Sequence, residues 1–69
     1  MSEARLGSNL KAIRTAAGLT QAELADRAKV SRKTINTVEN GVFIPSTVLA
    51  LTLARALGVT VEELFFLTD

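Results

Sequence analysis

The hydrophobic and polar positions along the chain divide it into short helical segments. One apolar stripe at helical spacing opens the chain and consists of Leu6, Leu10, Ile13 and Ala17. It predicts a helix that packs by a single face. The segment 47–57 is apolar almost all round, so a helix there belongs at the centre of the domain or at an interface. No stretch has the β-branched alternation of a strand.

Capping residues and glycines set the limits of these segments. Hydroxyl residues between apolar neighbours mark three helix starts, at Thr20, Ser31 and Thr60. Glu23 and Glu63 complete a capping box at two of them. The predicted helix stops are Gly18, Gly41 and Gly58, and Pro45 followed by Ser46 marks a further start. The five predicted helices span about 4–17, 21–28, 32–40, 47–57 and 61–66, which indicates an all-α fold in one domain over 1–69.

Residues 21–40 have the spacing of a helix-turn-helix, in which a tight turn joins two short crossing helices. Ala25 falls where the two helices approach most closely, and a small side chain is needed there. Val30, Ile35 and Val38 face inward and set the angle of the second helix. An ordinary αα-hairpin uses the same apolar pattern, so the outer face has to decide between the two.

The outer face of the second helix carries no acid. At about 100° per residue, five side chains lie opposite the buried side: Arg32, Lys33, Asn36, Thr37 and Asn40. A solvated helix face usually mixes Glu with Lys, whereas this face offers donors that match the acceptors of base edges and phosphates. Arg32 and Lys33 also occupy the first turn, where the helix dipole disfavours cations by roughly 0.3–1 kcal/mol each. A bound polyanion would reverse that penalty, so the face favours nucleic-acid contact.

The composition excludes most other kinds of functional site. The chain has 69 residues with no Cys and no His, which excludes disulfides, the usual zinc sites and imidazole catalysis. Glu62 and Glu63 point about 100° apart on a helix and form no carboxylate pair, so we do not expect an enzyme. No apolar stretch approaches the roughly 18 residues of a membrane span. We expect a cytoplasmic protein with no membrane contact, cofactor, metal or small-molecule ligand.

The formal charge is unevenly distributed. Residues 1–33 carry a local net charge of +4 and residues 34–69 one of −3, within a total of +1. This polarity suits one face directed at a polyanion and another directed elsewhere.

The sequence resembles the lambda-repressor-like, or XRE, family of helix-turn-helix regulators over nearly the whole chain, from Leu6 to Phe65. The matching stretches are Ile13-Arg14, Gly18 to Ala25, Val30 to Ile35, Val38-Glu39-Asn40-Gly41, Pro45-Ser46 and Leu57-Gly58-Val59. The resemblance implies a compact five-helix bundle that binds operator DNA, usually as a homodimer.

Carried over to this sequence, the resemblance implies two sets of DNA contacts. The base-contacting residues would be Arg32, Lys33, Asn36 and Thr37. The backbone-contacting residues would be Gln21, Ser31, Thr34, Asn40, Arg14 and Phe43. Arg14 and Glu39 match a pair that forms an internal salt bridge in this family, so structural pairing and phosphate contact stay equally open for Arg14. A polar helix start is the alternative for Gln21.

The chain departs from the family pattern at two places. Lys29 stands in the turn where the family often has Gly, and a positive φ there costs about 1 kcal/mol. It adds charge near the DNA backbone or is an exposed turn lysine. Val42, Phe43 and Ile44 form an apolar loop, in which Phe43 packs on the sugar-phosphate backbone, on a partner or on its own domain.

The C-terminal segment 61–67 holds more large apolar side chains than one short helix can bury. We expect Leu64 and Phe65 in the core. Phe66 and Leu67, with the exposed part of the helix at 47–57, would form a two-fold dimer interface, the alternative being a loosely covered C-terminus. A dimer would place two reading helices about 34–36 Å apart on a near-palindromic operator.

The leading hypothesis is therefore a sequence-specific regulator of transcription, a repressor that binds a double-stranded DNA operator as a homodimer and occludes a promoter. The alternative is a protein-interaction module, for example an antitoxin-like partner that uses the apolar C-terminal face.

Overall fold

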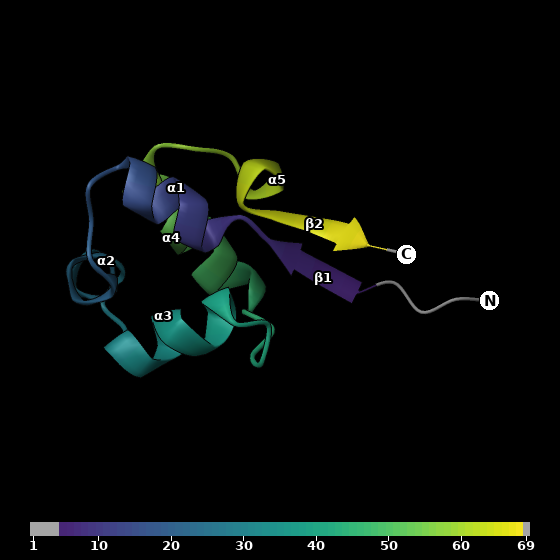
Figure 1. Cartoon of the computed structure of the whole chain (residues 1–69), viewed down its shortest axis with the longest axis horizontal. Coiled ribbons are helices and arrows are strands. Elements are labelled where there is room, and N and C mark those ends of the chain that lie inside the picture. Colours follow the sequence, from purple (N-terminus) through teal and green to yellow (C-terminus); the bar gives the residue numbers. More distant parts are fainter. Residues whose placement is uncertain (1–4, 69) are drawn as a thin grey trace.

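Five helices and two short strands make up residues 5–68, the part of the chain that the computed structural model describes (Figure 1). The elements are β1 (Arg5–Ser8), α1 (Leu10–Ala16), α2 (Gln21–Ala28), α3 (Arg32–Glu39), α4 (Thr47–Leu57), α5 (Val61–Leu64) and β2 (Phe65–Thr68). The helices gather into one body, and the two strands lie side by side and extend from it. None of the described helices has the length and apolar character needed to cross a membrane.

The core lies where the helices converge. Its fully buried large side chains are Leu10, Leu24, Ile35, Val38, Leu53 and Leu64. Small side chains also belong to this core, and Ala25, Ala28 and Ala54 are all buried. The prediction that Ala25 lies where α2 and α3 meet is consistent with its burial, and its carbonyl accepts a 3.0 Å hydrogen bond from the Val30 N–H in the connecting turn.

The predicted helix caps are confirmed. The hydroxyls of Thr20, Ser31, Ser46 and Thr60 each accept a hydrogen bond from the main-chain N–H three residues later. Glu23 and Glu63 close capping boxes with Thr20 and Thr60. These bonds satisfy N–H groups that have no partner within the helix, which is why α2, α3 and α4 begin where the sequence places them.

The all-α prediction is wrong at the two ends of the described chain. Residues 5–8 and 65–68 form an antiparallel two-stranded sheet with the register Arg5 to Thr68, Leu6 to Leu67, Gly7 to Phe66 and Ser8 to Phe65. The first helix therefore starts at Leu10 instead of about residue 4, and the last ends at Leu64 instead of residue 66. Gly7, Ser8 and Asn9 favour caps and turns over helix interiors, so the apolar stripe through Leu6 does not continue as a helix.

Two hydrogen bonds fix the point where the sheet meets the helices. The N–H of Asn9 donates to the carbonyl of Leu64 at 2.7 Å, and the hydroxyl of Ser8 accepts from the N–H of Leu10 at 3.1 Å. The start of α1 and the end of α5 are thereby held together, and both strands leave the body from the same place.

The two faces of the ribbon formed by β1 and β2 differ in their surroundings. Because side chains alternate along a strand, Leu6, Phe65 and Leu67 share one face and Gly7 and Phe66 the other. Phe65 is buried, and Leu6 packs on the core. The Phe66 ring lies against Gly7, where a Cβ atom would collide with it. The ribbon is therefore anchored at its base, while Leu67 farther along stays 73% exposed.

Candidate nucleic-acid interface

The outer face of α3 carries the polar side chains that the helical wheel predicts. Arg32, Lys33 and Asn36 are exposed, whereas Ile35 and Val38 on the opposite side are buried in the core. The predicted orientation of this helix is confirmed. Rigid packing of the underside holds the outer face in one position relative to α1 and α2.

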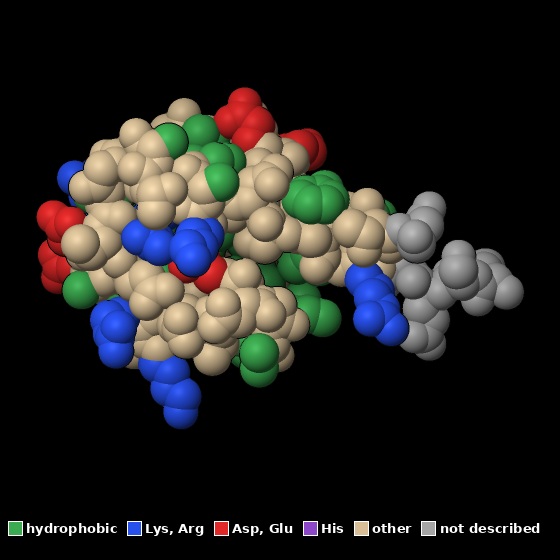
Figure 2. All heavy atoms as spheres, viewed as in Figure 1, with side chains coloured by type: hydrophobic (Ala, Val, Ile, Leu, Met, Phe, Trp, Pro, Cys, Tyr) green, Lys and Arg blue, Asp and Glu red, His purple; other side chains and the backbone are tan. Residues whose placement is uncertain are grey.

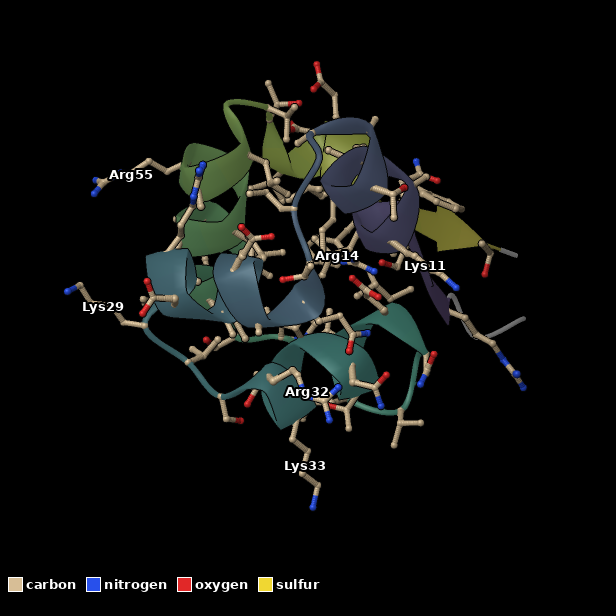
Figure 3. All side chains as sticks on the ribbon, turned by 60° about the vertical axis from the view of Figure 1, so that its left-hand side comes forward. Lys11, Arg14, Lys29, Arg32, Lys33 and Arg55 are labelled. Atoms are coloured by element: carbon tan, nitrogen blue, oxygen red, sulfur yellow. The ribbon has the colours of Figure 1, made fainter. Side chains whose placement is uncertain are left out.

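Basic side chains gather around this face. Arg32 and Lys33 project from α3 away from the body, and Lys11 of α1 lies beside Arg14 on the side that faces α3 (Figure 3). Lys29 and Arg55 project from the left-hand side of Figure 3, away from Lys11. Within residues 5–68, neither Arg32 nor Lys33 forms an ion pair. Figure 2 shows basic side chains over α3 and between α1 and α3, with a small acidic patch beneath the latter and larger acidic patches at the outer edges over α2 and α5.

Sequence reasoning did not single out Lys11 as a site residue. The signal that could have found it is its position three residues before Arg14, on the polar side of the first apolar stripe, because residues at this spacing share a helix face.

Arg14 and Glu39 form the internal ion pair that the family resemblance implies. The Nε and Nη2 of Arg14 donate to the two oxygens of Glu39 at 2.6 and 3.2 Å, and Nη1 donates to the Leu19 carbonyl at 2.8 Å. The side chains of Arg14 and Glu39 are only 9% and 2% exposed. The hydrogen bonds to Glu39 raise the pKa of Arg14 above its ordinary value, although burial acts in the opposite direction. The pair ties α1 to the end of α3.

A chain of amide hydrogen bonds continues from this ion pair to the surface. The Nε2 of Gln21, in the first turn of α2, donates to Glu39 Oε1 at 3.0 Å and to Asn36 Oδ1 at 3.2 Å. The Nδ2 of Asn40 donates to the same Asn36 oxygen at 3.4 Å. Buried charge and exposed amides thus belong to one network that crosses from α2 to α3.

The hydroxyls at the start of α3 are held by the helix itself. Ser31 Oγ accepts from the Thr34 N–H at 3.1 Å and lies 2.9 Å from the Thr34 hydroxyl. The Thr37 hydroxyl is half-buried and donates to the Thr34 carbonyl at 3.0 Å. These bonds fix the position of all three oxygens. One hydroxyl of the Ser31–Thr34 pair donates to the other, so the second keeps its hydrogen for an outside acceptor.

The apolar loop after α3 borders the polar face. The main-chain N–H groups of Val42 and Phe43 both donate to the Thr37 carbonyl, at 3.0 and 3.2 Å. Phe43 lines a hollow of about 180 Å³ together with Leu6 and Ser8 of β1, and 47% of its side chain stays exposed. Part of the ring therefore packs on its own domain, and the rest is open beside Asn40.

A helix-turn-helix whose second helix exposes an acid-free outer face is the class of DNA-binding domain that this fold and surface define. The sequence model of the helix-turn-helix family matches residues 10–64. The chain belongs to this family, in its XRE or lambda-repressor-like form, whose members are DNA-binding regulators of transcription and in general not enzymes.

Relatives and solved structures agree with this assignment. An HTH-type transcriptional regulator of Methanothermobacter thermautotrophicus is 49% identical over 75% of this chain and 77% of its own length. The regulator MJ0272 of Methanocaldococcus jannaschii is 40% identical over 90% of this chain and 94% of its own. The restriction-modification controller protein C.AhdI of Aeromonas hydrophila is similar in structure, with a TM-score of 0.75, 39% identity and coverage of 78% of this chain and 82% of its own.

Proposed function

We propose that the chain is a repressor that binds a near-palindromic operator as a homodimer, with α3 in the major groove of double-stranded DNA. The observation that carries the proposal is the outer face of α3, which holds exposed donors and no acid and is fixed by the burial of Ile35 and Val38. An α-helix fits the major groove, where the base edges present mostly acceptors.

The contacts divide into two sets by chemistry. The base-contacting residues are Arg32, Lys33, Asn36 and Thr37, and the backbone-contacting residues are Gln21, Ser31, Thr34, Asn40, Arg14 and Phe43. Gln21 meets phosphate through its main-chain N–H in the first turn of α2, because its side-chain NH₂ is used within the protein. Arg14 acts mainly by holding Glu39, with only the exposed edge of its guanidinium left for phosphate.

Lys11 extends the backbone set beyond the helix-turn-helix. Its exposed ammonium lies on the α1 side of the same surface, next to Arg14 (Figure 3). A phosphate contact there would add one counterion to those released on binding.

The homodimer is supported by apolar surface away from α3. An open groove of about 500 Å³ runs between the ribbon, α5 and the start of α4, and its walls include Leu6, Leu51 and Phe65. Ile44 at its rim, Leu51 on its wall and the ribbon residues Phe66 and Leu67 are exposed large apolar side chains. A second copy would cover such a surface, and two-fold symmetry would then set two α3 helices against two half-sites. Repression would follow from occupancy of the promoter.

The same groove favours a second candidate function, a protein-interaction module of the antitoxin type, in which another protein fills the groove. The two functions are compatible in one chain, but they depend on different surfaces.

Selection of binding sites from random duplexes tests the DNA proposal. The wild-type chain should enrich one sequence, and Arg32→Ala and Lys33→Ala should each lower affinity for it by about 5- to 150-fold, the equivalent of about 1–3 kcal/mol. Arg55→Ala removes the same charge from the other side of the molecule and should leave affinity nearly unchanged. Lys11→Ala should weaken all sequences alike and lower the salt slope by about one.

Two results would count against DNA reading. The first is a folded wild-type chain with no preference among duplexes at low salt. The second is an Arg32→Ala, Lys33→Ala double variant that keeps full affinity and folding. Retention of a protein partner by that double variant would favour the interaction module.

A further inference from the structure

Glu39 fixes the direction of the Gln21 side-chain amide. A carboxylate only accepts hydrogen bonds, so the group that Gln21 turns toward Glu39 Oε1 at 3.0 Å must be its NH₂. The second hydrogen of that NH₂ reaches Asn36 Oδ1 at 3.2 Å. Both donors of Gln21 are therefore used inside the protein, and the buried ion pair with Arg14 keeps Glu39 in place.

The fixed Gln21 in turn fixes Asn36. A donor must meet an acceptor, so the carbonyl oxygen of Asn36 faces Gln21, and it also accepts from Asn40 Nδ2 at 3.4 Å. The NH₂ of Asn36 then points the other way. Within residues 5–68 it donates to no acceptor, although the side chain is exposed on the outer face of α3.

We infer that Asn36 meets the base edges as a hydrogen-bond donor only, and that Gln21 is the positioning residue that makes it so. The inference rests on the proposed reading of DNA by α3. An asparagine with a free amide reads adenine with both ends, since it accepts from N6 and donates to N7. Here Asn36 Oδ1 already accepts from Gln21 and Asn40, so Asn36 cannot form both hydrogen bonds with adenine.

A donor-only amide selects a different base. Guanine presents two acceptors in the major groove, N7 and O6, which match the two hydrogens of the Asn36 NH₂. Adenine places an amino group next to N7, and cytosine offers an amino group alone, so both face the amide with a donor. Thymine presents one acceptor, O4, beside its methyl group, so it can accept from only one of the two hydrogens. The operator position opposite Asn36 should therefore be guanine, preferred over adenine by roughly tenfold.

Asn36→Asp tests this with a change of one atom. The inward oxygen still accepts from Gln21 and Asn40, while the outward donor becomes an acceptor. In selection from random duplexes, one position should change from guanine to a base with an amino group, cytosine or adenine. Ser31→Asp is the matched control, because Asp also caps a helix and brings the same negative charge to the surface. It should weaken binding to all sequences and change no position.

Gln21→Ala tests the positioning role. Without Gln21 the Asn36 amide can turn, so the guanine-to-adenine ratio at that same position should fall from roughly tenfold toward one. A lost phosphate contact or a less stable fold would lower affinity for every sequence equally and leave the ratio unchanged. Circular dichroism of each variant verifies that it is folded.

The outcomes separate this inference from the proposed function. If the wild-type chain selects no sequence, the proposed function fails. If it selects an operator but Asn36→Asp alters no position, or the altered position is adenine in the wild type, DNA reading stands and the donor-only assignment is overturned. If Gln21→Ala keeps the guanine preference, the positioning role of Gln21 is overturned.

Discussion

At the scale of single residues, the ion pair between Arg14 and Glu39 organises the surface more than it stabilises the fold. A buried ion pair gains little over an apolar pair of the same volume, because both charges leave water. The role of the pair here is to orient a neighbouring side chain. The guanidinium fixes the carboxylate, and the carboxylate orients Gln21 at the edge of the exposed face.

Loss of one partner of this pair should nevertheless be severe. Arg14→Ala leaves the Glu39 carboxylate, which is 2% exposed, without its cation, and we expect unfolding to become easier by about 3–5 kcal/mol. That is about the whole net stability of a core this size. Urea denaturation followed by circular dichroism measures it. Lys11→Ala on the same helix is the control and should change stability by less than about 0.5 kcal/mol. A folded Arg14→Ala with the wild-type midpoint would contradict this account.

Lys29 carries backbone strain. It ends α2 with a φ of 59°, so the left-handed conformation expected for this turn is present in a residue with a Cβ atom. Lys29→Gly should raise the free energy of unfolding by about 1 kcal/mol. Lys29→Ala removes the charge and keeps the Cβ atom, so it should give no such gain. Equal midpoints for the Gly and Ala variants in urea would show that the strain is absent.

At the scale of elements, the helices could be predicted from short-range sequence patterns. The ribbon could not, because its strands form only by pairing with each other across the length of the chain. The starts of α2, α3 and α4 depend on Thr20, Ser31 and Ser46, whose bonds reach only three residues ahead, so the sequence alone predicted them. Pairing of Leu6 with Leu67 joins positions about sixty residues apart. Neither segment alternates like a strand, and no short-range rule could find that contact.

The candidate site residues likewise include a part that the sequence pattern predicts and a part that depends on contacts between helices. The helical period was enough to predict which side of α3 faces outward. The bonds from Gln21 to Glu39 and Asn36 depend on how α2 crosses α3, which the sequence pattern does not contain.

An added methyl group at Gly7 should displace the Phe66 ring and destabilise the ribbon. A Cβ there would collide with the Phe66 ring, so Gly7→Ala should destabilise the protein by about 1–3 kcal/mol. In a Phe66→Ala background the same change should be nearly neutral, because the ring is gone. A double-mutant cycle of unfolding free energies measures the coupling. Additive effects of the two changes would contradict the contact.

The capping box of α2 should make the stability of the protein depend on pH. The N–H and hydroxyl of Thr20 lower the pKa of Glu23 below its ordinary value. Because the pKa of Glu23 is lower in the folded state, its ionised carboxylate stabilises the fold. This stabilisation is complete above the unfolded-state pKa of about 4.3 and is lost as the pH falls through the folded-state pKa. Glu23→Gln keeps an accepting oxygen but does not titrate, so its urea midpoint should fall less between about pH 5 and pH 3. Glu62→Gln, which changes no capping bond, should follow the wild type, and parallel curves for Glu23→Gln would reject the effect.

At the scale of the whole molecule, the two proposed surfaces use different residues and meet only at the loop after α3. DNA contacts lie on α3 with the neighbouring parts of α1 and α2, whereas the apolar groove lies between the ribbon, α5 and the start of α4. They come closest in the loop after α3, where Phe43 belongs to the DNA surface and Ile44 to the rim of the groove. A copy bound in the groove therefore leaves α3 open, which a dimer that reads two half-sites requires.

Oligomeric state tests this arrangement. The wild-type chain should sediment with about twice the monomer mass of 7.4 kDa at micromolar concentration. Leu67→Lys places a charge on the 73% exposed ribbon residue and should shift the protein to monomer. Val42→Lys adds the same charge at a 78% exposed apolar residue that belongs to neither the ribbon nor the groove wall, and this variant should remain dimeric. A wild-type monomer at high micromolar concentration would reject the dimer.

The pairing of Arg5 with Thr68 brings the two ends of the described chain side by side. A short turn that joins Thr68 to Arg5 would turn the ribbon into a hairpin and leave the helices where they are. The order in which the elements are connected is therefore separable from the way they pack. A circularly permuted chain, opened in the loop between α4 and α5, should therefore keep the outer face of α3 and select the same DNA sequence.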